Sequence, residues 1–172
     1  MESYLEKRIT ELSELILNKM TDEKLTLSVA ESCTAGLLAS ELTSISGASN
    51  YFKGGIICYS TSLKIRLLNV LPSLIEKHTA VSKEIADALS EEMCRIAESH
   101  YALAITGVAG PEGGTVVNPV GTVYISLAYN AKAVLSTRRV FNGERNHIRI
   151  AAVEEAMRML WDRLNNKFTT HI

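Results

Sequence analysis

The segment from Leu25 to Ser46 constrains the fold of this 172-residue chain more than any other stretch. Its first residues alternate apolar and polar side chains up to Val29, which predicts a short strand, and its later residues carry a leucine stripe at helical spacing. Only a short polar turn separates the two, so the strand is expected to pass directly into the helix, as in α/β folds. The backbone N–H groups at such a helix start are unpaired and can hold oxyanions or phosphates.

Two potential nucleophiles, Ser32 and Cys33, lie in that turn. In one interpretation Ser32 only caps the helix, because serine is a favoured N-cap residue. In the other, Ser32 attacks a substrate that is held at the helix start. The turn alone leaves both interpretations open.

Periodicity predicts further elements along the chain. The helical patterns are an N-terminal helix ending near Thr21-Asp22, short helices after Ser60 and at Pro72, a helix capped by Ser82, and a final helix from about Glu144. The further strands are expected at 56–59, 101–105, 120–129 and 133–141, the last two as an antiparallel hairpin. We therefore predict one domain over residues 1–172, a three-layer α/β/α sandwich with a mostly parallel sheet and an added antiparallel hairpin.

The composition argues against several classes of function. The chain has 18 basic and 19 acidic residues and no basic block, which argues against nucleic acid as a partner. No apolar run is long enough to cross a membrane, and the N-terminus has a charged, helical pattern rather than that of a signal peptide. The three cysteines lack the spacing of metal ligands, so we expect reduced thiols in a cytoplasmic protein. No cluster of metal ligands is visible in the sequence, and we expect neither a metal nor a cofactor.

Three chemically informative features each follow a predicted strand: Ser32, Tyr59 with nearby Lys64, and the glycine-rich loop 107–114. The carboxyl ends of parallel strands meet at one edge of the sheet, where ligands bind in open α/β folds. We therefore expect one site. The loop has neither the P-loop nor the dinucleotide-binding pattern, so it is either an anion-binding nest of N–H groups or a plain turn.

Lysine is the candidate base of this site. Lys64 is either solvated or buried beside Ser32, where desolvation would lower its pKa and make it a general base. Among the histidines, His147 remains a possible base. Arg145 and Arg149 share one face at the start of the final helix, where the helix dipole favours carboxylates. These two arginines are therefore either solvated or bound to an anionic group of the substrate.

Six motifs occur in order along the chain: Ala30–Gly36, Tyr59-Ser60 with Lys64, Ala80–Ser82, Thr106–Gly114, Pro119–Val123 and Phe141–Arg145. Together they resemble the motifs of the CinA C-terminal domain family, the nicotinamide-nucleotide amidases. The resemblance implies hydrolysis of nicotinamide mononucleotide to nicotinic acid mononucleotide and ammonia. It also implies that Ser32 is the nucleophile, with Lys64 and Tyr59 as its catalytic partners.

In the expected mechanism Lys64 takes the proton of Ser32, and the N–H groups of Cys33 and Thr34 stabilise the oxyanion. Tyr59 either hydrogen-bonds Ser32 or Lys64 or only packs at its strand end. The predicted substrate contacts are Glu31, Thr106, Gly107, Ala109, Gly110, Gly113, Gly114, Arg145 and Arg149. We expect the stand-alone form of the family, acting on a small molecule as a homo-oligomer.

One residue departs from the family pattern. Ala35 stands where the family usually has glycine, and its methyl group would crowd the helix start or the substrate. This departure leaves room for a non-catalytic nucleotide-binding or regulatory domain. A second alternative is a cysteine hydrolase that uses Cys33, because a thiolate is favoured at a helix N-terminus.

Overall fold

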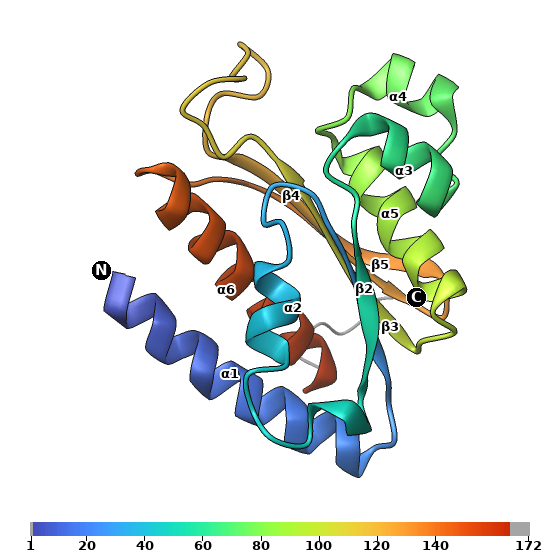
Figure 1. The fold of residues 1–172 in the computed structure, drawn as a ribbon, viewed down its shortest axis with the longest axis vertical. Helices are drawn as coiled ribbons and strands as arrows, with labels where there is room; N and C mark the ends of the chain where they lie inside the picture. The colour runs from blue at the N-terminus through green and yellow to red at the C-terminus, as the bar shows by residue number, and fades with distance from the viewer. Residues whose placement is uncertain (1, 166–172) are drawn as a thin grey trace.

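The computed structural model describes residues 2–165 and has a five-stranded mixed sheet between two layers of helices (Figure 1). The strands lie in the order β2-β1-β3-β4-β5. β1 pairs in parallel with β2 and β3, and β4 pairs antiparallel with β3 and β5. The strands are β1 (Leu27–Glu31), β2 (Phe52–Ile57), β3 (Tyr101–Gly107), β4 (Thr122–Tyr129) and β5 (Lys132–Val140). The predicted α/β class, with a mostly parallel core and an added antiparallel hairpin, is confirmed.

The helices form the two outer layers, with α1, α2 and α6 on one face of the sheet and α3, α4 and α5 on the other (Figure 1). Their bounds are α1 (Glu2–Asp22), α2 (Leu37–Leu42), the 3₁₀ helix η1 (Ala48–Asn50), α3 (Thr61–Leu68), α4 (Pro72–His78), α5 (Lys83–Ile96) and α6 (Arg145–Leu164).

Each face of the sheet carries its own hydrophobic core. Strand side chains alternate between the faces, so β3 gives Leu103 and Ile105 to the core under α1, α2 and α6. It gives the small Ala102 and Ala104 to the core under α5. These alanines leave room for α5 against the sheet, while the larger side chains fill the space beneath the other three helices.

The second strand differs from the prediction at both ends. It was expected at 56–59, but β2 begins at Phe52 and ends before Cys58. Gly54 and Gly55 explain why the start was predicted too late, because glycine is depleted in strands and usually indicates a turn. A Cβ on Gly55 would lie 2.5 Å from the Cγ2 atom of Val29 on β1, so glycine allows the two strands to approach closely.

Other boundaries agree with the sequence patterns. α1 ends at Asp22, as its stripe predicted. Ser60 and Ser82 cap α3 and α5, and their hydroxyls accept the N–H groups of Leu63 and Ile85. The hydrogen bond of a serine N-cap therefore fixes where each helix begins.

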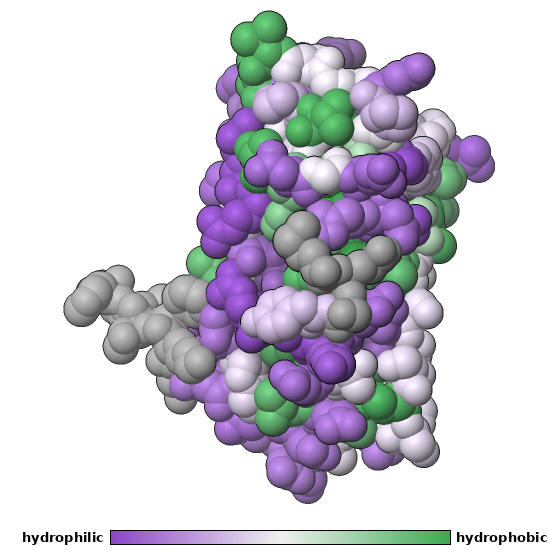
Figure 2. Space-filling model, turned by 90° about the vertical axis from the view of Figure 1, so that its left-hand side faces the viewer, coloured by the Kyte–Doolittle hydropathy of each residue, from purple (hydrophilic) through white to green (hydrophobic). Residues whose placement is uncertain are grey.

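In the part of the chain that the structure describes, no helix is both long and apolar enough to cross a bilayer. Figure 2 shows a mostly hydrophilic face over α1 and α6, with apolar side chains gathered at the top of the view. At that end the loop 108–121, between β3 and β4, projects beyond the sheet (Figure 1) and exposes Val116 and Val117.

Candidate active site

Ser32 directly follows β1, and that strand runs two residues further than predicted. Ser32 is buried, and its N–H group donates to the carbonyl of Ile105 on β3 at 3.0 Å. α2 begins only at Leu37, with Gly36 as its N-cap. The interpretation of Ser32 as the helix cap is therefore wrong, because the turn 33–36 separates it from the helix.

Glu31 supplies the cap that Ser32 does not. Its buried carboxylate accepts the N–H groups of Gly36 at 3.0 Å, Leu38 at 3.1 Å and Ala39 at 2.8 Å. A carboxylate at a helix N-terminus is stabilised by the unpaired N–H groups and by the helix dipole. Glu31 was predicted to contact the substrate, but the structure places its charged oxygens on α2 instead.

Two N–H groups of the turn stay available for a ligand. Those of Ser32, Ala35 and Gly36 are all bonded within the protein. Among the described residues, no acceptor is bonded to the N–H groups of Cys33 and Thr34. These are the two donors that the sequence predicted for the oxyanion.

Lys64 lies near the start of α3 and is only 2% exposed. Its Nζ atom lies 2.9 Å from the Oγ atom of Ser32, 2.7 Å from the carbonyl of Cys58 and 3.4 Å from that of Tyr59. No carboxylate of the described residues pairs with it. Burial lowers the pKa of Lys64 below its ordinary value, because desolvation disfavours the ammonium form. The interpretation of Lys64 as a solvated surface lysine is therefore wrong, and its amine is positioned to exchange a proton with Ser32.

Tyr59 is placed differently from the prediction. Its side chain is 54% exposed, and its hydroxyl accepts a hydrogen bond from Nη2 of Arg145 at 3.0 Å. Only its backbone carbonyl contacts Lys64. The predicted hydrogen bond from the Tyr59 hydroxyl to Ser32 or Lys64 is therefore absent.

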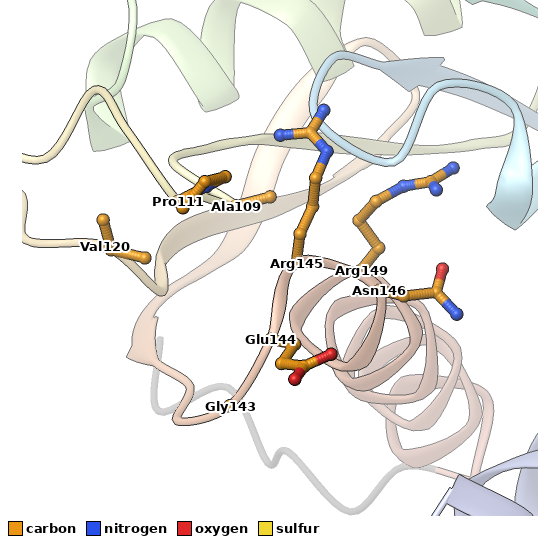
Figure 3. A pocket seen from close by; sticks show the side chains of 8 residues that line it. All are labelled: Ala109, Pro111, Val120, Gly143, Glu144, Arg145, Asn146 and Arg149. Atoms are coloured by element: carbon orange, nitrogen blue, oxygen red, sulfur yellow. The ribbon is translucent and has the colours of Figure 1, made fainter.

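Arg145 and Arg149 leave α6 one turn apart and extend in the same direction, while Glu144 points away from them (Figure 3). Nη1 of Arg145 donates to the carbonyl of Gly110 at 2.7 Å. Nη2 of Arg149 donates to the carbonyl of Thr34 at 2.8 Å. Neither arginine is simply solvated: Arg145 contacts the glycine-rich loop, and Arg149 contacts the turn that follows Ser32.

These groups border two neighbouring cavities. The smaller, of about 260 Å³, is lined by Ser32, Cys33, Tyr59, Thr61, Lys64, Ala80, Val81, Thr106, Gly107, Val108, Ala109, Gly110, Glu112, Gly113 and Arg145. The larger, of about 760 Å³, is lined by Ala109, Pro111, Val120, Gly143, Glu144, Arg145, Asn146 and Arg149 (Figure 3). Arg145 and Ala109 border both, so Arg145 lies at the boundary between the cavities. The three features that follow β1, β2 and β3 thus come together in the smaller cavity.

Steric constraints explain why glycines occur in the loop that lines the smaller cavity. A Cβ on Gly107 would lie 2.7 Å from a backbone oxygen at the start of β4, and one on Gly110 would lie 2.5 Å from Cγ1 of Val120. Gly110 and Gly113 also have positive φ angles, which favour glycine. Gly114 lines neither cavity. The loop therefore brings backbone close to the site, and its use as an anion-binding nest stays a prediction.

Thr106 also has a partner inside the protein. Its hydroxyl donates to the carbonyl of Ala80 at 2.9 Å, and the side-chain amide of Asn118 donates to the carbonyl of Val81 at 2.8 Å. These bonds hold the segment 79–82 against the smaller cavity. The sequence analysis assigned no function to Ala80 and Val81. The motif Ala80–Ser82, one of the six that resemble the family, could have indicated that they lie at the site.

The other candidate nucleophile and base are less well placed. Burial raises the pKa of Cys33 to about 11, so little thiolate exists near neutral pH. His147 does not line either cavity. Within residues 2–165, no three His, Cys, Asp or Glu side chains are grouped as metal ligands would be. Ser32 and Lys64 are thus the pair whose geometry fits acyl transfer.

The chain matches known proteins over most of its length. Residues 9–164 match the family model described as the CinA C-terminal domain. A CinA-like protein from Koribacter versatilis is 47% identical over 139 residues, which are 81% of this chain and 33% of that protein. Another CinA-like protein, from Geobacter sp., is 39% identical over 160 residues, 93% of this chain and 38% of that protein. The chain therefore spans about a third of the length of the curated relatives that it matches.

Solved structures share the fold over almost the whole chain. The competence/damage inducible protein CihA from Agrobacterium tumefaciens is 34% identical and has a TM-score of 0.88, with 92% of this chain and 96% of that chain covered. The competence damage-inducible protein A from Klebsiella pneumoniae is 28% identical, also with a TM-score of 0.88, over 91% and 97% of the two chains.

Proposed function

The chain belongs to the CinA C-terminal domain family, and from this membership and its site we propose that it is a nicotinamide-nucleotide amidase. The proposed reaction converts nicotinamide mononucleotide and water to nicotinic acid mononucleotide and ammonia. The observation that supports it best is the buried contact of 2.9 Å between Nζ of Lys64 and Oγ of Ser32. A neutral lysine amine beside a serine hydroxyl is a base and nucleophile pair that can cleave an amide.

Catalysis would begin with proton transfer. The Oγ atom of Ser32 attacks the carboxamide carbon while its proton passes to the neutral amine of Lys64. The carbonyl oxygen becomes an oxyanion and accepts hydrogen bonds from the N–H groups of Cys33 and Thr34. In serine hydrolases, loss of one such donor costs about 3–4 kcal/mol of transition-state stabilisation.

Two bond cleavages complete the cycle. Lys64 returns the proton to the amide nitrogen, and the carbon–nitrogen bond breaks. Ammonia departs, and the acyl group remains bound to Ser32 as an ester. Water then attacks the ester carbon and gives its proton to Lys64. Lys64 then gives this proton to the Oγ atom of Ser32 as the ester bond breaks, which restores the hydroxyl, and the acid product leaves and ionises to the carboxylate.

The nucleotide part of the substrate would extend toward α6. Arg145 borders both cavities and donates to two neutral oxygens, those of Gly110 and Tyr59. A 5′-phosphate is a stronger acceptor for a guanidinium than either, because its hydrogen bonds are charge-assisted. The glycine-rich loop beside Arg145 would supply further N–H donors to the same phosphate.

An ammonia-release assay with nicotinamide mononucleotide tests the proposal directly. Mass spectrometry of the product should show the carboxylate in place of the amide, and Ser32→Ala protein should give neither product nor ammonia. Binding of the mononucleotide without turnover would instead support the non-catalytic nucleotide-binding domain. The position of Ala35 weakens that alternative, since its exposed side chain lines neither cavity.

A further inference from the structure

The turn of residues 32–36 carries both the nucleophile and the two free N–H donors, so its shape decides whether they face the same atom. Its backbone is not in a relaxed conformation. Ala35 has a φ of 51° and Gly36 a φ of 94°, both in the left-handed region. A non-glycine residue in this region costs about 1–2 kcal/mol, so such a turn keeps its shape only when its surroundings hold it.

Local contacts hold both ends of the turn. The N–H group of Ser32 is bonded to Ile105 on β3, and that of Gly36 is bonded to Glu31. In the middle of the turn the carbonyl of Thr34 accepts the N–H group of Leu37 at 3.2 Å and, within the part of the chain that the structure describes, one side-chain donor from a distant segment. Nη2 of Arg149 donates to the carbonyl of Thr34 at 2.8 Å, across 115 residues of sequence.

Arg149 is held in place by α6. The neighbouring residues Ile148 and Ile150 are buried, so α6 is fixed against the core. The Nε atom of Arg149 is also buried and has no hydrogen-bond partner among the described residues. The charge of the Arg149 guanidinium also acts on the turn. It is one of the influences that lower the pKa of the Cys33 thiol, although burial has the larger effect and raises that pKa. A positive charge that favours an anion at Cys33 favours an oxyanion at the same N–H groups.

We propose that Arg149 is a positioning residue, whose hydrogen bond to Thr34 keeps the N–H groups of Cys33 and Thr34 aimed at the oxyanion. Arg145, one turn earlier, contacts Gly110 and Tyr59 instead. The two arginines therefore have different roles: Arg145 binds the anionic end of the substrate, and Arg149 fixes the conformation of the turn. This assignment departs from the sequence analysis, which placed both arginines on the substrate.

The inference rests on the proposed amidase activity, but it predicts a property that does not require that substrate. A small neutral fluorophosphonate modifies a serine only under two conditions. The serine hydroxyl must be activated, and the phosphoryl oxygen of the reagent must accept hydrogen bonds from the oxyanion donors. The rate of covalent modification of Ser32, followed by intact mass, therefore reports the shape of the turn. The variants are Arg149→Met, which keeps the stem but removes the donors, and Arg149→Lys, which keeps one donor and the charge.

Arg149→Met should slow both the modification of Ser32 and kcat for nicotinamide mononucleotide by about tenfold or more, as small misplacements of reacting groups do. KM should stay within about twofold, because the substrate is not the partner of Arg149. Arg149→Lys should recover part of both rates. Arg158→Met is the matched control, since Arg158 lies on the same helix and pairs with Glu155 and Asp162 away from the cavities, and it should change neither rate.

Two results would overturn the inference. A raised KM with unchanged modification of Ser32 would make Arg149 a phosphate ligand. Equal slowing in Arg149→Met and Arg158→Met would mean that α6 arginines act only through stability. If Ser32 is modified in an Arg149-dependent way but the mononucleotide is not hydrolysed, the proposed substrate is wrong and the positioning by Arg149 stands.

Discussion

The amine of Lys64 lies 2.9 Å from the hydroxyl of Ser32, although 32 residues separate them in the chain. Ser32 follows the central strand β1, and Lys64 enters from α3, which follows the neighbouring strand β2. The other partners of the amine are the neutral backbone carbonyls of Cys58 and Tyr59. Since no carboxylate of the described residues pairs with its ammonium form, Lys64 has the environment of a base rather than of a structural cation.

Ser32→Ala should abolish amide hydrolysis and leave the fold intact. The rate should fall by at least about 10³-fold, because the nucleophile is lost. The free energy of unfolding should change by less than about 2 kcal/mol, since Ser32 does not cap a helix and Lys64 keeps its carbonyl partners. Cys33→Ala should retain most activity. Ammonia release and thermal unfolding measure the two effects, and turnover by the serine variant but not by the cysteine variant would move the nucleophile to Cys33.

Lys64→Arg should be nearly inactive, because arginine stays protonated and cannot accept the proton of Ser32. In the wild type only the neutral amine is active, so kcat/KM should rise with pH as Lys64 deprotonates. The midpoint should lie below the ordinary lysine pKa of 10.5, because burial lowers the pKa of Lys64. The control is Lys83→Arg, on an exposed lysine paired with Asp87, which should leave the profile unchanged. A near-normal rate for Lys64→Arg would show that Lys64 supplies only charge.

Arg145→Ala should act on substrate binding. The apparent KM for nicotinamide mononucleotide should rise about ten- to a hundredfold, as expected for loss of a charge-assisted hydrogen bond to the phosphate. Any slower hydrolysis of the unphosphorylated riboside should keep its rate, because that compound has no phosphate. Steady-state kinetics on both compounds checks this, and equal losses on the two would assign Arg145 to the geometry of the site instead.

Ala35→Gly should stabilise the protein. Ala35 has a φ of 51°, where glycine escapes the steric cost that alanine bears, so the free energy of unfolding should rise by about 1 kcal/mol. This corresponds to an increase in Tm of about 2–4 °C. Ala39→Gly, inside α2, is the matched control and should lower the stability by about 0.5–1 kcal/mol. Thermal unfolding of both variants tests the sign, and a destabilised Ala35→Gly protein would show that the φ angle carries no strain.

Local patterns were enough to predict much of this architecture. The alternation before Ser32 and the leucines after it predicted a strand and a helix, and the parallel order of the strands predicted that Ser32 and Lys64 would lie at the same edge of the sheet. Contacts that depend on how the elements pack together leave no such local pattern in the sequence. The capping of α2 by Glu31 depends on how far the turn delays the helix, and the contact of Arg149 with Thr34 depends on how α6 packs. The contact of the Tyr59 hydroxyl with Arg145 likewise joins residues 86 positions apart, and the sequence left open whether that hydroxyl would bond at all.

The carboxylate of Glu31 has a consequence for the direction in which a ligand can enter. A helix N-terminus usually attracts anions, but at α2 the carboxylate of Glu31 already accepts three N–H groups at that end. The N–H groups of Gly36, Leu38 and Ala39 are therefore not free for an anionic group of a ligand, whereas the guanidinium of Arg145 borders both cavities. For a ligand with one neutral and one anionic end we therefore expect the anionic end to bind toward Arg145 on α6 rather than at the start of α2.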